Sequence, residues 1–197
     1  MRIFLVTLIL IFTLQSWTRA NDIKEFEIEG ISLGDSLLEH FTEEEIKNFV
    51  IKNPGFNQKD EYYELYIYLN NSENYEYLKV TFKQNDKTYK IYGIGGVVYF
   101  PDNYNDCIKT QKKIIKDVEN LFVNANKYDA GKNPSVYDQS GESYFIETNF
   151  TFKNGDMARV YCSYWTESIT REKGWKHSLQ FLLNDNEFLD FLRRSYN

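Results

Sequence analysis

Apolar and polar residues alternate along three consecutive segments, residues 62–69, 75–83 and 89–100. This period of two is typical of strands with one buried face. In the first segment Leu65 and Ile67 fall on one face, and tyrosines fall on the other. The pattern predicts a three-stranded antiparallel meander. Glycines interrupt its last strand and predict a bulge or a close backbone approach at Gly93, Gly95 and Gly96.

A second meander is predicted in the last third of the chain. Residues 144–153 and 156–165 alternate in the same way and flank Asn154-Gly155, which is a strong hairpin signal. Residues 175–183 continue with apolar side chains at every second position, so they predict a third strand.

The register of the hairpin follows from its apolar pattern. A plain two-residue turn would place Phe150 opposite Arg159, which mixes core and solvent positions on one face. A one-residue bulge instead sets Ile146 opposite Cys162 and Phe150 opposite Ala158. The sequence therefore predicts the bulged register.

Helices are predicted where the apolar spacing lengthens to three and four residues. Thr42 and Glu45 form a capping box, so a helix is expected from Glu43 to Ile51. Further helices are predicted at residues 107–125 and 185–194, and a short one after Asp35 or Ser36.

This order predicts an α+β fold, a two-layer sandwich in which an antiparallel sheet, or two such sheets, carries helices on one face. It also predicts a pseudo-repeat of a helix followed by a three-stranded meander, with halves near residues 28–100 and 107–183. Residues 126–142 show no period and predict a long loop. Residues 21–197 are expected to form one domain.

The first 20 residues have the pattern of a secretory signal peptide. Arg2 precedes an apolar run from Ile3 to Leu14, and Thr18-Arg19-Ala20 offers a cleavage site. The run is shorter than the roughly 20 residues that span a bilayer, and no Cys lies near the cleavage site for a lipid anchor. We expect an exported protein, periplasmic or extracellular after cleavage near Ala20, with no stable membrane insertion.

Charge and cysteine content narrow the class of protein. Removal of Arg2 and Arg19 from the 23 Lys and Arg residues leaves 21 against 29 Asp and Glu, a net charge of −8, so nucleic acid is not an expected partner.

The only two cysteines, Cys107 and Cys162, are expected to form a disulfide in an exported chain, the alternative being two free buried thiols.

Gly34-Asp35-Ser36-Leu37 spells the nucleophile motif of the GDSL-type hydrolases. That family pairs the serine with a late His that follows an Asp by three residues, whereas Gly174 stands three residues before His177. A serine without a base is not activated, so we expect Asp35 and Ser36 to cap a helix. A secreted hydrolase with Ser36 as nucleophile remains the alternative.

Metal and cofactor chemistry find little support in the sequence. His40 and His177 are the only histidines, and neither has a His or Cys at a zinc-ligand spacing. Residues 102–106 resemble the start of a calcium loop, but Cys107 replaces the required glycine and Lys113 the bidentate glutamate. We expect no metal and no cofactor.

Tyrosines gather on the polar face of the first meander and form the candidate binding face. A tyrosine-rich sheet face can bind a partner because the ring packs while the hydroxyl stays hydrated. The alternative is that helices cover this face. The candidate residues are Tyr62, Tyr66, Tyr68, Tyr75 and Tyr77.

Part of the chain resembles small exported proteins of unknown function from AT-rich marine bacteria. The likeness rests on the run I-E-G-I-S-L-G-D-S-L-L at residues 28–38, followed by Phe41 and Glu44-Glu45-Ile46. The helix-helix-strand order after the I-x-x-G-x-S at residues 31–36 is also remotely similar to the BamE and β-lactamase-inhibitor-protein fold. That resemblance implies protein binding without chemistry, and fold alone does not fix function.

Together these patterns predict an exported, non-enzymatic binding or interaction protein. Its expected partner is another envelope or extracellular protein, or a small ligand. A purely structural envelope protein is a further alternative.

Overall fold

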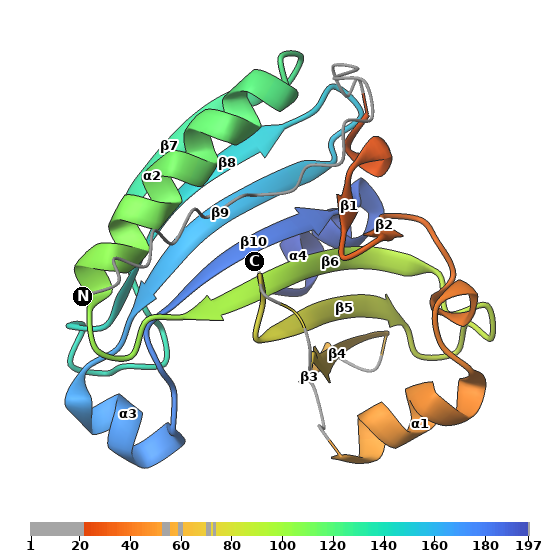
Figure 1. Cartoon of the computed structure of the whole chain (residues 1–197), viewed down its shortest axis with the longest axis horizontal. Coiled ribbons are helices and arrows are strands. Elements are labelled where there is room, and N and C mark those ends of the chain that lie inside the picture. The colour runs from red at the N-terminus through yellow and green to blue at the C-terminus, as the bar shows by residue number, and fades with distance from the viewer. Residues whose placement is uncertain (1–21, 53–55, 59–60, 70–71, 73, 197) are drawn as a thin grey trace, which may run out of the picture.

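A computed structural model describes residues 22–52, 56–58, 61–69, 72 and 74–196. The predicted signal peptide and its cleavage site lie outside the described residues. An eight-stranded antiparallel sheet with helices on its two faces makes up most of the described chain (Figure 1), which confirms the α+β class.

The sheet is continuous, with strand order β3-β4-β5-β6-β10-β9-β8-β7. The two predicted meanders meet where β6 pairs with β10, so residues about 85 positions apart in the chain become neighbours. The strands are β3 (Phe56–Gln58), β4 (Tyr62–Tyr68), β5 (Tyr77–Lys83), β6 (Ile91–Tyr99), β7 (Asn126–Pro134), β8 (Tyr144–Thr151), β9 (Met157–Tyr164) and β10 (Ser178–Asn184).

The hairpin of β8 and β9 has the predicted bulged register. Ile146 lies opposite Cys162 and Phe150 lies opposite Ala158. In the turn, Gly155 has a φ of 92°, which a residue with a side chain rarely adopts. The pattern of core residues therefore specified the register correctly.

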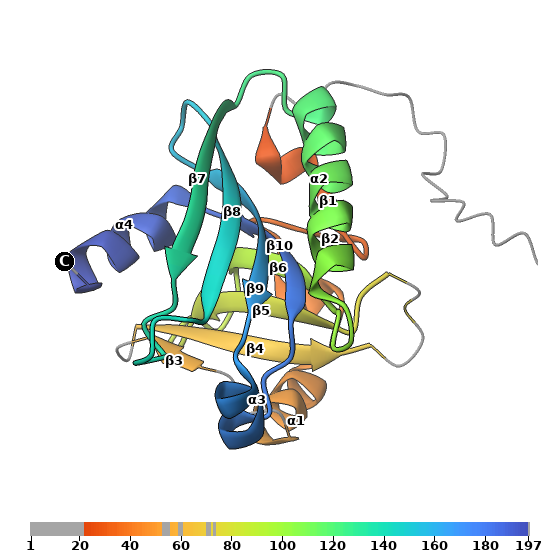
Figure 2. The ribbon, with the colours of Figure 1, turned by 90° about the vertical axis from the view of Figure 1, so that its left-hand side faces the viewer.

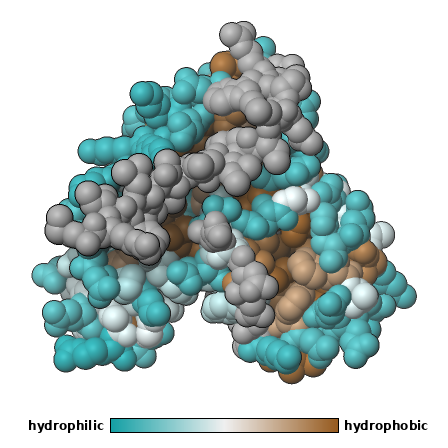
Figure 3. All heavy atoms as spheres, viewed as in Figure 1, coloured by the Kyte–Doolittle hydropathy of each residue, from teal (hydrophilic) through white to brown (hydrophobic). Residues whose placement is uncertain are grey.

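One face of the sheet, called the front face here, packs against helix α2 (Tyr104–Leu121) and the N-terminal segments. Those segments are the 3-10 helices η1 (Ile23–Glu25) and η2 (Leu37–Glu39), the β1–β2 hairpin (Glu27–Ile28 and Ile31–Ser32) and helix α1 (Glu43–Lys52). Apolar side chains from all of them share one core with the front face of the sheet. In a space-filling view the outer surface of α2 is hydrophilic (Figure 3).

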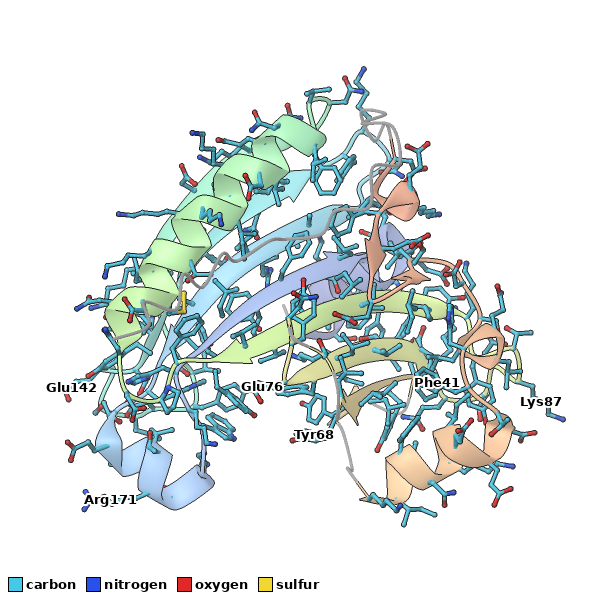
Figure 4. The ribbon with its side chains drawn as sticks, viewed as in Figure 1. Phe41, Tyr68, Glu76, Lys87, Glu142 and Arg171 are labelled. Atoms are coloured by element: carbon cyan, nitrogen blue, oxygen red, sulfur yellow. A yellow bond between two sulfur atoms is a disulfide. The ribbon has the colours of Figure 1, made fainter. Side chains whose placement is uncertain are left out.

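Two contacts hold α2 on the sheet. Cys107 forms a disulfide with Cys162 of β9, as predicted (Figure 4). The buried amide of Gln111 donates to the carbonyls of Ile146 (2.7 Å) and Val160 (3.2 Å). Because buried amides need hydrogen-bond partners, the Gln111 hydrogen bonds fix the position of α2 over β8 and β9.

The opposite face, called the rear face here, carries helix α4 (Asn186–Tyr196) at one end. Figure 2 shows α2 and α4 on opposite sides of the sheet. Phe188 and Phe191 of α4 pack on Tyr62 and Tyr92. Helices thus lie on both sides of the sheet and not on one face alone, as the sequence had predicted, and α4 covers only one end of the rear face.

Residues 126–142 were predicted to form a loop, which is correct for residues 135–142 and wrong for residues 126–134. Residues 126–134 form the edge strand β7, which pairs with β8 along its length. Most of its side chains are exposed, so neither face of the strand needs apolar residues and no alternation appears. Pro134 and exposed lysines are typical of an edge strand that is protected from further pairing.

Helix α3 (Glu167–Lys173) was not predicted. It lies between β9 and β10 and ends at Gly174, whose φ of 70° is the left-handed conformation of a helix C-cap. The predicted pseudo-repeat is also not confirmed in its stated form, because α1 and α2 are each followed by four strands and α3 interrupts the second set. No helix in the described part of the chain has the length and apolar character to cross a membrane.

Candidate functional site

A row of side chains crosses five strands on the rear face. Tyr68 of β4 pairs with Tyr77 of β5, and Tyr77 pairs with Val97 of β6. Gln180 of β10 pairs with Val97 on one side and with Tyr161 of β9 on the other. Because directly opposite residues in antiparallel strands share a face, these five side chains lie on one face of the sheet, and Val97 is fully buried among them.

An ion pair lies beside this row. The ammonium of Lys79 is 3.2 Å from the Glu64 carboxylate, and both side chains are only 16% exposed. The hydroxyl of Tyr66 donates to the same carboxylate at 2.9 Å. Across the sheet, the hydroxyl of Tyr161 donates to Gln180 at 2.5 Å. Polar side chains on the rear face therefore link β4 with β5, and β9 with β10.

Burial alone would lower the pKa of Lys79, but the Glu64 carboxylate and the nearby phenol groups outweigh it and raise the pKa. Burial raises the pKa of Tyr66 and of Tyr77. Lys79 is therefore charged, and the phenols are neutral hydrogen-bond donors, across the physiological range. Such a cluster offers fixed donors and aromatic surface to a partner.

The tyrosine rings also contact one another. The ring centroid of Tyr77 lies 5.6 Å from Tyr66, 5.2 Å from Tyr68 and 5.9 Å from Tyr99. Tyr68, at the end of β4 (Figure 4), is 50% exposed, while the other three are partly exposed. Packed rings lose little conformational entropy on binding, so this surface is preorganised.

The structure brings together three of the five predicted tyrosines, Tyr66, Tyr68 and Tyr77. Tyr62 shares the face but is fully buried under α4, and burial raises its pKa to about 12. Tyr75 lies on the front face, where its ring occupies the space above Gly96. Tyr62 and Tyr75 therefore do not belong to the exposed face that the sequence predicted.

The predicted set lacked six members of the site, which are Glu64, Lys79, Val97, Tyr99, Tyr161 and Gln180. Lys79 and Tyr99 could have been predicted, because the alternation of their own strands places them on the same face as the tyrosines. Tyr161 and Gln180 join the site only through the pairing of β6 with β10, which no local pattern reveals.

Further aromatic residues extend this surface toward α3. Phe145 of β8 lies 5.9 Å from Tyr161 and 5.5 Å from Trp165, measured between ring centroids. Trp165 in turn lies 4.6 Å from Trp175, which meets Tyr137 at 5.3 Å. We call Phe145, Trp165, Trp175 and Tyr137 the aromatic extension.

The turn between β7 and β8 holds Tyr137 in place. The buried carboxylate of Asp138 accepts hydrogen bonds from the backbone and hydroxyl groups of Ser140 and Ser143, and from the hydroxyl of Thr166. These bonds tie the turn to the start of α3, in the region where Figure 4 labels Glu142 and Arg171. The aromatic extension is therefore built on a hydrogen-bonded support.

Ser36 and the two histidines, which the sequence offered as candidate catalytic or metal-binding residues, have structural contacts. Ser36 caps η2, since its hydroxyl accepts from the Leu38 amide at 3.1 Å and donates to the Thr88 carbonyl. His40 lies 3.6 Å from the Asp35 carboxylate. His177 is half-buried and accepts a hydrogen bond at Nδ1, as expected for a structural histidine.

Residues 102–106 serve as the start of α2. Asn103 is the N-cap, and its side chain accepts from the Asn105 amide at 3.1 Å. Within the described residues, no group of three or more His, Cys, Asp or Glu side chains is arranged to hold a metal ion.

Two hollows lie on the described surface. One of about 330 Å³ is lined by Asp22, Asn124 and the 152–154 turn, and one of about 350 Å³ by Glu61, Lys83 and residues 85–86. Neither of these two hollows is lined by a member of the tyrosine row.

Comparisons of the chain with protein-family models, with curated proteins and with solved structures return no match. The site is therefore interpreted from its own geometry.

Proposed function

We propose that this protein is an exported, non-enzymatic binding module whose rear face binds another protein. The observation that supports this most is the preorganised cluster of Tyr66, Tyr68, Tyr77 and Tyr99 beside the Lys79–Glu64 ion pair. Tyrosine supplies large contact area and a hydrogen-bonding group, and it is enriched at the energetic centres of protein interfaces.

The shape of the surface favours a protein over a small ligand. Small-molecule sites are concave and bury most of the ligand, and two hollows of the described surface are lined by residues outside the tyrosine row. The row instead crosses five strands and continues into the aromatic extension. Such breadth suits the large contact area of a protein interface.

Two opposed charge pairs lie on this surface. Lys79 pairs with Glu64, and Arg159 lies 3.9 Å from Glu147 while its Nε donates to Asn149. The chain as a whole carries a formal charge of −6. Because these opposite charges are paired, this part of an acidic protein does not repel a charged partner. The aromatic rings then contribute most of the binding energy.

Export is supported by the N-terminal sequence and by the disulfide. Residues 1–20 have the composition of a signal peptide, and Cys107–Cys162 is the kind of bond that persists in oxidising compartments.

Affinity capture from the compartment to which the protein is exported tests the proposal. The bait would be the wild-type chain, the Tyr68→Ala/Tyr99→Ala double variant, and Ile51→Ala as the control, because Ile51 is 76% exposed on α1. A protein retained by wild type and by Ile51→Ala, and lost with the double variant, supports the rear face. Equal retention by all three baits, or retention by none, contradicts it.

A further inference from the structure

His177 and Trp165 close the neck of the loop that contains α3. Trp165 directly follows β9, and His177 directly precedes β10. The backbone N–H of Trp165 donates to Nδ1 of His177 at 3.1 Å. In this bond the imidazole must be an acceptor at Nδ1, so it is the neutral tautomer that carries its proton on Nε2.

Aromatic rings enclose this imidazole. It stacks on Tyr164 of β9 at 4.8 Å and meets Tyr104 of α2 edge-on at 5.5 Å, measured between ring centroids. Tyr144 of β8 contacts both tyrosines. The enclosure is half-buried, and burial lowers the pKa of His177.

Two lysine ammonium groups lie over aromatic rings near this enclosure. Lys176, the preceding residue, lies over the Tyr99 ring at 5.0 Å, and Lys132 of β7 lies over the Tyr144 ring at 3.8 Å. No ion pair of the described residues includes His177; His40 has one with Asp35. An imidazolium at position 177 therefore lacks a counter-charge from α2, β7, β8 or β9.

Protonation of His177 removes the hydrogen bond that closes the neck of the α3 loop. A proton taken from solvent binds Nδ1, which becomes a donor and faces the N–H donor of Trp165. The hydrogen bond is lost, and the amide and the imidazolium repel each other. Because Trp165 also contacts Trp175 and Phe145, the loss acts on the aromatic extension of the rear face.

We propose that the His177–Trp165 hydrogen bond is a pH-sensitive latch: acidification opens the neck of the α3 loop and disorders the aromatic extension of the binding surface. The consequence for binding rests on the proposed function, whereas the latch itself does not. A protein exported from the cell meets the pH of its surroundings, so this switch would act where the partner is bound.

Tryptophan fluorescence reports on this neck. Trp17, Trp165 and Trp175 are the only tryptophans, and the last two belong to the neck and its loop. In the full chain with Trp17→Phe, emission comes from these two alone. We expect a reversible shift of the emission to longer wavelength as the pH falls from 8 to 4.5, with a midpoint below the ordinary histidine value of 6.5 and an unchanged far-UV circular dichroism spectrum.

The matched variant is His177→Asn, because Oδ1 of asparagine occupies the place of Nδ1 and accepts the Trp165 N–H without titrating. We expect the shift to disappear in His177→Asn and to persist in His40→Asn. A shift that persists in His177→Asn, or a folded wild type whose emission is constant over this range, overturns the latch.

If His177→Asn does not fold, hydrogen exchange and NMR titration of the wild-type chain test the latch. The Trp165 amide should then lose protection from hydrogen exchange at the pH where the His177 ring titrates by NMR, and retained protection below that pH overturns the proposal. These measurements use the protein without a binding partner. Their outcome is therefore independent of the affinity-capture experiment.

Discussion

The ammonium of Lys79 lies 3.2 Å from the carboxylate of Glu64, and both side chains are largely withdrawn from water on the rear face of the sheet. The pair positions Tyr66, which donates to the same carboxylate. Removing one partner leaves a poorly solvated charge, which costs more than the pair itself contributes.

Lys79→Met should therefore lower the free energy of unfolding by about 2–3 kcal/mol. Glu64→Gln should have a smaller cost, and the double variant should lose clearly less than the sum, because no uncompensated charge remains. Urea denaturation of all four forms measures the coupling. Strictly additive losses would show that the two groups do not interact.

Gly96→Ala should destabilise the protein by about 1–3 kcal/mol, because an added Cβ would overlap the ring of Tyr75. In a Tyr75→Ser background the same substitution should cost much less. Thermal denaturation of the two single variants and the double variant provides the test. An equal cost in both backgrounds would place the Tyr75 ring elsewhere.

Asp138 should make stability depend on pH in the acid range. Hydrogen bonds from Ser140 and Ser143 hold the pKa of Asp138 well below its ordinary value of 3.8. The unfolded chain therefore takes up this proton first, so the contribution is complete above pH 3.8 and is lost as the pH falls below it. The slope of unfolding free energy against pH in this range should be smaller for Asp138→Asn than for wild type, and identical slopes would contradict the assignment.

Removal of the disulfide should leave the fold intact but less stable. Cys107 and Cys162 are 55 residues apart, which corresponds to about 4 kcal/mol of chain entropy in the unfolded state. The Cys107→Ala/Cys162→Ala variant should show a lower midpoint of denaturation and an unchanged far-UV circular dichroism spectrum. A variant as stable as wild type would show that the loop closure contributes nothing.

Local patterns predicted most of the secondary structure. The capping box of Thr42 and Glu45 forms as expected, with the Thr42 amide donating to Glu45 at 2.8 Å and the Glu45 amide donating to Thr42 at 3.2 Å. The apolar pattern also specified the register that sets Ile146 opposite Cys162. Both features depend on residues close in sequence, where side-chain period and backbone geometry are tightly linked.

The site was predicted only in part because it depends on long-range pairing. Tyr161 lies 95 positions after Tyr66, and the two belong to one surface because β6 pairs with β10. Tyr75 precedes β5 by two residues, so extending the alternation of that strand to Tyr75 assigned it to the wrong face. Strand β7 escaped prediction because an exposed edge strand has no apolar face.

We propose above all that a protein partner binds the rear face at its tyrosines. Site-specific photo-cross-linking in the exporting cell tests it most directly, with a benzophenone amino acid placed at Tyr68 in one chain and at Ile51 in another, since both side chains are at least half exposed. We predict one discrete protein adduct from position 68 and none from position 51. No adduct from position 68, or the same adducts from both positions, would contradict the claim.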